Sequence, residues 1–290
     1  MSWRTIVISS SAKLDYQLGF MVIRKQDTVK VHISEISVLL IETTAVSLTA
    51  ALLSELMKKK VKVIFCDEKR NPCSELVSYY GCHDTSMKVR KQMDWSADIK
   101  ASVWTEIVGD KIRKQAEHLE RYDLDESEML FQYINQLQFK DETNREGHAA
   151  KVYFNALFGL DFTRTAENSV NAALNYGYGI ILSIFNREIT ANGYITQIGL
   201  FHDNMFNPFN LGSDLMEPYR PLVDRIVKEL NPRKFEHEEK MEMLNVLQRE
   251  VVISGRREYV NNAIRIYCRS VFDALNNQDV SLIKFYRDEL

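Results

Sequence analysis

The chain has 290 residues, 45% of them hydrophobic, and a formal net charge of −3. This is enough apolar material for two domains, and the charge argues against a protein that coats nucleic acid by bulk attraction, while leaving room for local basic patches. No apolar run approaches the roughly 20 residues of a membrane span, and the N-terminal sequence lacks the pattern of a signal peptide. Four scattered cysteines indicate neither a zinc site nor a disulfide framework, so we expect a reduced, cytoplasmic protein.

Residues 3–42 are short runs rich in β-branched residues, broken by Ser, Gly and Asp, and they predict successive strands. The pattern then changes, because Leu48, Leu52 and Leu56 recur every four residues and lysines follow, which predicts one helix. The runs "VKVIFCD" and "ELVSYY" predict two further strands. Residues 1–80 are therefore expected to form a small β-rich domain with one helix.

After Gly81 the apolar residues keep helical spacing, interrupted by an irregular stretch at 194–213. Short basic clusters such as "DKIRKQ" (110–115) each fit the solvated face of a helix. There is no internal repeat, low-complexity tract or heptad pattern in the sequence. We predict an α+β protein in which a larger, all-helical domain covers residues 85–290.

The first candidate for chemistry is Glu146 in "TNREGHAAKVYFNALFG". Thr143 and Glu146 are three residues apart, which fits a capping box at a helix start. Glu146 also lies on the apolar face of that helix, where a carboxylate is costly unless it is paired or binds a cation. His148 is on the other side of the helix and should be exposed. The apolar face consists of Ala149, Ala150, Tyr153 and Leu157.

Two further candidates lie in "GLFHDNMFNPFNLGSDLMEPYRP". His202 follows a strand-like run, where a lone histidine commonly has a structural hydrogen bond. Asp214 and Glu217 are three residues apart, which places both carboxylates on one helix face near its start. Asp214 or the serine before it could cap that helix, and Arg220 could pair with Asp224 four residues later.

Each of these residues has a structural explanation when it is taken alone. Taken together, one imidazole and two or three carboxylates make a hard, oxygen-rich site that suits Mg²⁺ or Mn²⁺ better than zinc. Such metals typically serve phosphoryl chemistry, because they neutralise phosphate and activate an attacking oxygen. Spacing along the chain does not by itself show that these segments converge.

The stretches "NREGHAAKVYFNALFG", "NAALNYGYGIILSIFNRE" and "GLFHDNMFNPFNLGSDLMEPYRP" resemble the CRISPR-associated integrase family, the first-numbered Cas protein, which is the catalytic subunit of spacer acquisition. The resemblance covers essentially the whole chain and is most specific between residues 143 and 224. The wording "REGHAA" and "FNLGSDLMEPYRP" is most similar to the subtype II-A branch, which accompanies an RNA-guided Cas nuclease.

The resemblance implies a Mg²⁺ or Mn²⁺ site with Glu146, His202 and Glu217 as ligands and Asp214 as a supporting or alternative ligand. It implies an enzyme that transfers protospacer 3′-hydroxyl ends into the CRISPR repeat, by endonuclease-type phosphodiester chemistry. The absence of a Gly-rich phosphate loop agrees with a reaction that needs no nucleotide hydrolysis.

Basic and aromatic residues in the matching motifs are candidates for contacts with DNA. Each cation could equally be a solvated helix charge, and the tyrosines could line the site or stack on a splayed base, although the core is the better place for Tyr153. The candidate phosphate contacts are Arg145, Lys151, Arg187 and Arg220, and the candidate site-lining residues are Tyr176 and Tyr178.

The resemblance also implies partners and a division of labour between the domains. It predicts a homodimer formed through residues 1–80, a catalytic domain at 85–290, and a heterohexamer with the small second-numbered Cas protein on double-stranded DNA, both protospacer and leader-repeat. The II-A nuclease and a ring-shaped accessory protein would take part in the bacterial cytoplasm. Two alternatives stay open: a non-catalytic DNA-binding scaffold of the same fold, and a metal-dependent nuclease for branched DNA.

Overall fold

The computed structural model describes residues 4–78 and 82–288, and the chain divides into two compact units. The N-terminal unit is Met1–Thr85 with Thr190–Asn192, and the C-terminal unit is Ser86–Ile189 with Gly193–Leu290. Within the described ranges, no helix is both long and apolar enough to cross a membrane.

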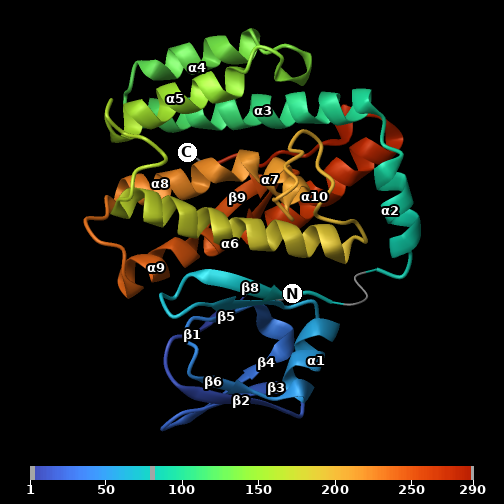
Figure 1. Cartoon of the computed structure of the whole chain (residues 1–290), viewed down its shortest axis with the longest axis vertical. Helices are drawn as coiled ribbons and strands as arrows, with labels where there is room; N and C mark the ends of the chain where they lie inside the picture. Colours follow the sequence, from blue (N-terminus) through green and yellow to red (C-terminus); the bar gives the residue numbers. More distant parts are fainter. Residues whose placement is uncertain (1–3, 79–81, 289–290) are drawn as a thin grey trace. The chain divides into compact units, whose positions relative to one another are not determined.

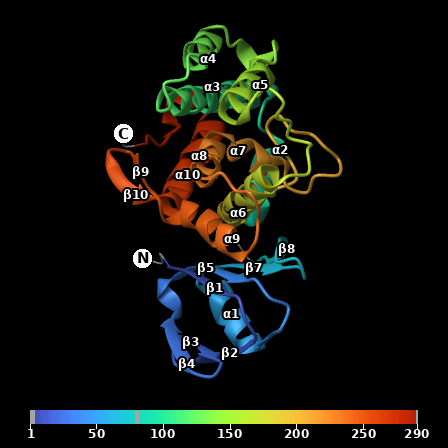
Figure 2. The same cartoon turned by 90° about the vertical axis from the view of Figure 1, so that its left-hand side faces the viewer.

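The N-terminal unit is built from two four-stranded sheets. The first has the order β1-β5-β7-β8 and is parallel except for β8; its strands are β1 (Arg4–Ile8), β5 (Ile36–Ile41), β7 (Lys62–Cys66) and β8 (Pro72–Leu76). The second has the order β4-β3-β2-β6; its strands are β2 (Ala12–Gln17), β3 (Phe20–Arg24), β4 (Thr28–His32) and β6 (Val46–Leu48). Helix α1 (Ala50–Lys58) packs against β2 and β7, so it contacts both sheets (Figures 1 and 2).

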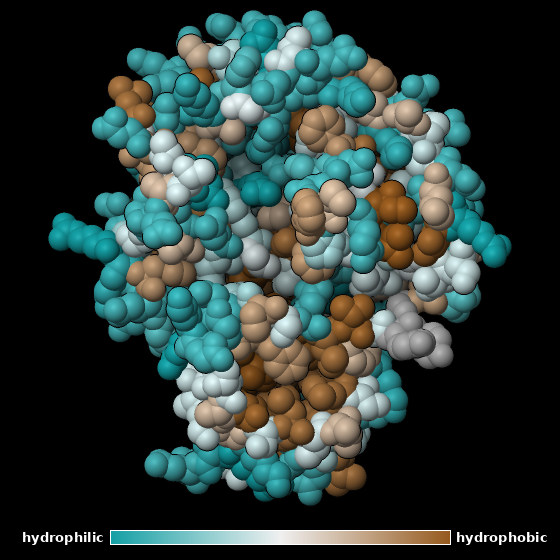
Figure 3. Space-filling model, in the orientation of Figure 1, coloured by the Kyte–Doolittle hydropathy of each residue, from teal (hydrophilic) through white to brown (hydrophobic). Residues whose placement is uncertain are grey.

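The apolar pattern of the sequence explains this unit. Every residue of β5 is buried, as expected for a central strand covered on both faces. Leu52 and Leu56 of α1 are fully buried in the core, and the Thr49 hydroxyl caps the helix by accepting the amide of Leu52 at 3.3 Å. The expected helical stripe was wrong at Leu48, which lies in β6, because the helix begins only after this cap. In Figure 3, hydrophobic residues gather over this unit on the face drawn.

The C-terminal unit is mainly helical, and its long helix α3 packs against α4, α5, α8 and α10. A 3-10 turn η3 (Glu217–Tyr219) joins α7 to α8 and also contacts α3. Figure 1 shows α4 and α5 lying along α3. The helices are α2 (Thr85–Met93), α3 (Ala97–Glu120), α4 (Glu126–Asn135), α5 (Arg145–Phe158), α6 (Ser169–Ala191), α7 (Asn210–Leu215), α8 (Arg220–Leu230), α9 (His237–Leu244) and α10 (Val260–Asn277).

The prediction that this second part is all-helical was wrong at one place. Strands β9 (Glu250–Ile253) and β10 (Arg256–Tyr259) form an antiparallel hairpin. Ser254 and Gly255 connect them with positive φ angles of 54° and 74°, as a tight hairpin turn requires. The β-branched run before this turn favours a strand over a continuation of the preceding helical pattern.

Candidate functional site

The start of α5 does not have the predicted capping box. Asn144 occupies the N-cap position in a left-handed conformation, and its side chain makes no capping hydrogen bond. Instead the Asp141 carboxylate accepts the amides of Arg145 at 2.7 Å and Glu146 at 3.0 Å. Because Asp141 satisfies these amides, the side chain of Glu146 is free to reach across to α3. His148 is exposed, as predicted.

His202 lies in an irregular loop, so the expectation of a preceding strand was wrong. The fully buried Asp214 carboxylate organises this loop by accepting the amides of Leu200 at 2.6 Å, Phe201 at 3.1 Å and His202 at 3.1 Å. Its Oδ1 also lies 2.5 Å from His202 Nδ1. A carboxylate that accepts backbone amides requires Nδ1 to be the donor, so Nε2 is the ring nitrogen available to a ligand.

His202 is held toward its protonated form by two neighbouring carboxylates, with Arg220 acting in the opposite direction. Its hydrogen bond to Asp214 raises the pKa of His202 above the ordinary value, burial opposes this, and the charges of Asp214 and Glu217 add to the increase. Trp104 of α3 stacks on Phe201 with 4.5 Å between ring centroids and meets His202 edge-on at 5.7 Å. A buried carboxylate and an indole therefore both hold this loop.

Glu146 and Glu217 converge on the ammonium group of Lys111. Lys111 Nζ contacts Glu146 Oε1 and lies 2.5 Å from Glu217 Oε2, while Arg220 Nε lies 3.0 Å from Glu217 Oε1. Burial alone would raise the pKa of Glu217, but the charges of Arg220 and Lys111 outweigh it and lower this pKa. The prediction that Asp214 and Glu217 share the face of one helix start was wrong, because Asp214 lies in the last turn of α7 and Glu217 begins η3.

Lys111 was not among the predicted site residues, because its cluster, residues 110–115, has the composition of a solvated helix face. The side chain is in fact only 7% exposed. Burial alone would lower the pKa of Lys111, but the neighbouring Glu217 and Glu146 carboxylates raise it above the ordinary lysine value. The one available signal was the position of Lys111 four residues after Ile107 on the buried face of α3.

The predicted ligand atoms are not packed into one tight cluster. In the part of the chain that is described, the one group of three or more such atoms within 4.8 Å of one another comes from the consecutive residues Cys82, His83 and Asp84. Glu146 and Glu217 are instead separated by the ammonium of Lys111, which both of them contact.

The candidate phosphate contacts differ in how exposed their side chains are and in the contacts that they already make. Lys151 is exposed and borders an aromatic-lined cavity of about 350 Å³. The Arg145 guanidinium lies 5.2 Å from the ring centroid of Tyr133. Arg187 is turned inward, because it donates to Asn261 Oδ1 at 2.8 Å and pairs with the acid that follows it in α6. The structure therefore favours Lys151 as a surface contact and does not favour Arg187.

The cluster of Glu146, Glu217, Lys111 and Arg220 is called the acidic site below. Of the two candidate site-lining tyrosines, Tyr178 is near it. Its hydroxyl donates to Asp224, and its ring centroid lies 4.7 Å from the Arg220 guanidinium. Tyr176 packs elsewhere, with its ring 5.6 Å from that of Phe235. The predicted ion pair between Arg220 and Asp224 is replaced by the pair of Arg220 with the nearer glutamate at the start of η3.

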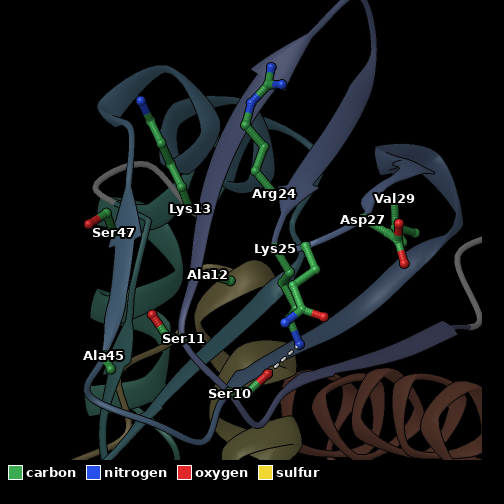
Figure 4. Close-up of a pocket in the computed structure, with 11 residues that line it drawn as sticks. Ser10, Ser11, Ala12, Lys13, Arg24, Lys25, Asp27, Val29, Ala45 and Ser47 are labelled. Atoms are coloured by element: carbon green, nitrogen blue, oxygen red, sulfur yellow. Dashed lines mark hydrogen bonds between the residues drawn. The ribbon is translucent and has the colours of Figure 1, made fainter.

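A second candidate site is an open cavity of about 760 Å³ in the N-terminal unit. Lys13 of β2 and Arg24 of β3 are paired across the second sheet and border it together (Figure 4). The Lys25 ammonium donates to Ser10 Oγ at 2.7 Å in the same cavity. Asp27 also borders the cavity and Arg24 is paired with Asp15, so its lining is of mixed charge. This cavity was not among the predicted sites.

Comparisons with known proteins place the chain in a family. The family model described as "CRISPR associated protein Cas1" matches residues 5–258. A CRISPR-associated endonuclease Cas1 from Neisseria meningitidis is 36% identical over 229 residues, which is 78% of this chain and 75% of that protein. A casposase bound to an integration product has the same fold, with a TM-score of 0.76 and 16% identity over 97% of this chain and 93% of that one. A chain of a Cas6-RT-Cas1–Cas2 complex matches with a TM-score of 0.72 and 17% identity over 97% of this chain and 36% of its own length. The protein therefore belongs to the CRISPR associated protein Cas1 family.

Proposed function

We propose that the protein is the integrase of CRISPR spacer acquisition, which joins 3′-hydroxyl ends of a DNA fragment to a phosphodiester of the CRISPR repeat in a divalent-metal-dependent reaction. The observation that carries the proposal is the convergence of Glu146 and Glu217 on one cationic group, in a member of this family. The reaction exchanges one phosphodiester for another. The protein therefore has to stabilise the charge that develops on the phosphate and to position the attacking hydroxyl.

The donor set fits Mg²⁺ or Mn²⁺. Glu146 and Glu217 would each give a carboxylate oxygen and His202 its Nε2, which is a hard set of the kind these ions prefer. We assign Asp214 the task of orienting His202, because its oxygens already accept three amides and face the imidazole. A bound ion would stabilise the charge that develops on the phosphate and activate the attacking hydroxyl.

The other residues around the acids would act on the substrate and on the ligands. Arg220 pairs with Glu217, and its side chain is 28% exposed, so it could also contact a phosphate oxygen. The ring of Tyr178 packs against the Arg220 guanidinium. Lys151 and Arg145, near the start and on the surface of α5, would contact the DNA backbone.

The partners belong to the same proposal. A Cas1–Cas2 assembly among the solved structures supports a Cas2 partner for this chain, and double-stranded DNA follows from the resemblance of the sequence. The homodimer through the N-terminal unit, and the II-A nuclease with its ring-shaped accessory protein, follow from the resemblance of the sequence.

A strand-transfer assay tests the function. Purified protein with its small Cas partner is incubated with a labelled duplex bearing 3′-hydroxyl ends and a plasmid carrying a leader and repeat, with Mg²⁺, Mn²⁺ or EDTA. We expect label on the plasmid only with metal, and a loss of at least about 100-fold in Glu146→Gln, Glu217→Gln and His202→Asn. The exposed Glu142 and His148 provide the matched controls Glu142→Gln and His148→Asn, which should retain joining.

Two results would contradict the proposal. Joining that survives in His202→Asn or in EDTA would remove the metal site from the reaction. Binding of DNA without joining or cleavage by the wild type would favour the non-catalytic scaffold, whereas metal-dependent cleavage of branched DNA without joining would favour the nuclease.

A further inference from the structure

Lys111 occupies an unusual position for a lysine. It lies in the middle of α3, is 7% exposed, and contacts carboxylates from α5 and from η3 at once. A second buried lysine on the same helix, Lys114, is 6% exposed and pairs with Asp110 four residues before it. Lys111 is thus the member of this pair whose ammonium contacts carboxylates from two separate segments of the chain.

The charges at the acidic site are already balanced without a metal. Glu146 and Glu217 contribute two negative charges, and Lys111 and Arg220 contribute two positive charges. A divalent ion bound by the same two carboxylates would add two more positive charges beside a buried ammonium. Repulsion at such short range is little screened by solvent or salt, so the ion and the Lys111 ammonium compete for the same oxygens.

We propose that Lys111 is a positioning residue that holds Glu146 and Glu217 in place and makes divalent-cation binding depend on a DNA phosphate. This inference rests on the proposed function. A phosphate that enters with the ion supplies the missing negative charge and becomes the new partner of the ammonium. A lysine suits this exchange, because its compact ammonium sits on a flexible stem and can turn from one anion to another.

The test measures Mn²⁺ binding directly, by the electron paramagnetic resonance signal of free Mn²⁺. Titrations are made with and without a short duplex whose 3′ ends lack the hydroxyl, so that no reaction follows. The variants are Lys111→Met, Lys111→Gln, which is a second neutral replacement in case the first does not fold, and Lys111→Arg. Lys114→Met is the matched control for the loss of a buried lysine from α3, and circular dichroism checks folding.

We expect the wild type to bind Mn²⁺ at least about tenfold more tightly with the duplex than without it. Without DNA, Lys111→Met and Lys111→Gln should bind Mn²⁺ at least about tenfold more tightly than the wild type, and DNA should improve their affinity little. Lys111→Arg keeps the charge and should retain the dependence on DNA, and Lys114→Met should behave as the wild type. A lysine with a merely structural role would give the opposite sign, because its loss would disorder the ligands and weaken binding.

The inference is overturned if both neutral variants, when folded, bind Mn²⁺ no more tightly than the wild type. It is also overturned if the wild type binds Mn²⁺ equally with and without DNA. In either case, a loss of Mn²⁺ binding in Glu146→Gln would leave the proposed metal site standing. If no variant binds Mn²⁺ under any condition, both this inference and the proposed function fail.

Discussion

Asp214 illustrates how one buried side chain can shape the loop that carries a candidate ligand. Its carboxylate closes the loop before α7 by accepting three consecutive amides, and it directs His202 through Nδ1. Gly199 permits this arrangement, because a Cβ there would collide with the carbonyl of His202 and with Asp214 Oδ2. The geometry of the imidazole thus depends on a residue twelve positions further along the chain.

We therefore predict that Asp214→Asn lowers the free energy of unfolding by about 2 kcal/mol and reduces strand transfer sharply. An amide cannot accept at both oxygen positions, so at least one backbone N–H loses its acceptor and Nδ1 loses its charged partner. Urea unfolding and the plasmid-joining assay measure the two effects. Asp203→Asn, an exposed acid of the same loop, is the control. Equal stability and activity in the two variants would refute this role for Asp214.

Asp224 belongs to a buried chain of hydrogen bonds behind the acidic site. Burial raises the pKa of Asp224 to about 6, although the hydroxyls of Tyr178 and Tyr153 and the charges of Arg220 and Lys111 act in the opposite direction. Tyr153 is fully buried, as predicted, and its hydroxyl lies 2.6 Å from His118 Nδ1. The ionised carboxylate is therefore less favourable in the folded protein than in the unfolded chain.

Because the pKa of Asp224 is raised on folding, the free energy of unfolding depends on pH. Between the unfolded pKa of 3.8 and the folded pKa of about 6, the native state binds more protons than the unfolded state, so stability falls as the pH rises. The shift corresponds to about 3 kcal/mol. From pH 4 to pH 7 we expect Asp224→Asn to gain about 2 kcal/mol of unfolding free energy relative to the wild type, measured by urea denaturation. A difference between the two proteins that does not change with pH would show that Asp224 does not titrate in this range.

At the scale of elements, the close packing of α6 depends on small residues. A Cβ at Gly177 would lie 2.5 Å from Val223 Cγ1 of α8 and 2.6 Å from Met243 Cε of α9, whereas at Gly179 it would meet nothing within 4 Å. Both glycines are inside the helix, where alanine is intrinsically favoured by about 0.5–1 kcal/mol. The two positions therefore separate packing from helix propensity.

We predict that Gly177→Ala destabilises the protein by about 1–3 kcal/mol, because the added methyl group overpacks the contact with α8 and α9. Gly179→Ala should instead stabilise it by about 0.5–1 kcal/mol. Thermal or urea unfolding of the two variants beside the wild type gives both signs. If Gly177→Ala proves as stable as Gly179→Ala, the helices can separate without cost and the packing argument is wrong.

The whole molecule carries a net charge of −3, so DNA binding must come from local cations and not from bulk attraction. If Arg145, Lys151 and Arg220 each neutralise one phosphate, the affinity for duplex DNA falls by about 40-fold between 50 and 200 mM salt. Lys151→Ala should lower the slope of log K against log salt by about one. Fluorescence anisotropy measures this, with the exposed Lys284→Ala as control. An unchanged slope in Lys151→Ala would remove that residue from the DNA contact.

Much of the fold follows from local pattern. The β-branched runs of residues 3–42 form the predicted strands, and Leu52 and Leu56 face the core as their spacing indicates. The family resemblance is likewise a property of the sequence, and the family match bears it out. The prediction of an all-helical second domain was wrong at 250–253, where a β-branched run follows a helical pattern and forms a strand, because Ser254 and Gly255 turn the chain back.

The sequence by itself therefore determined most of the elements, the family and the residue types of the proposed metal site. Only the tertiary structure decided which of those residues contact one another. Lys111 meets Glu146 across 35 residues, and Asp214 folds the loop of His202 instead of capping a helix. Such contacts are not encoded in spacing along the chain, because they depend on which buried charges meet when separate helices pack. A carboxylate in a helical interior must find a partner, but only the packing of α3 supplies a lysine there.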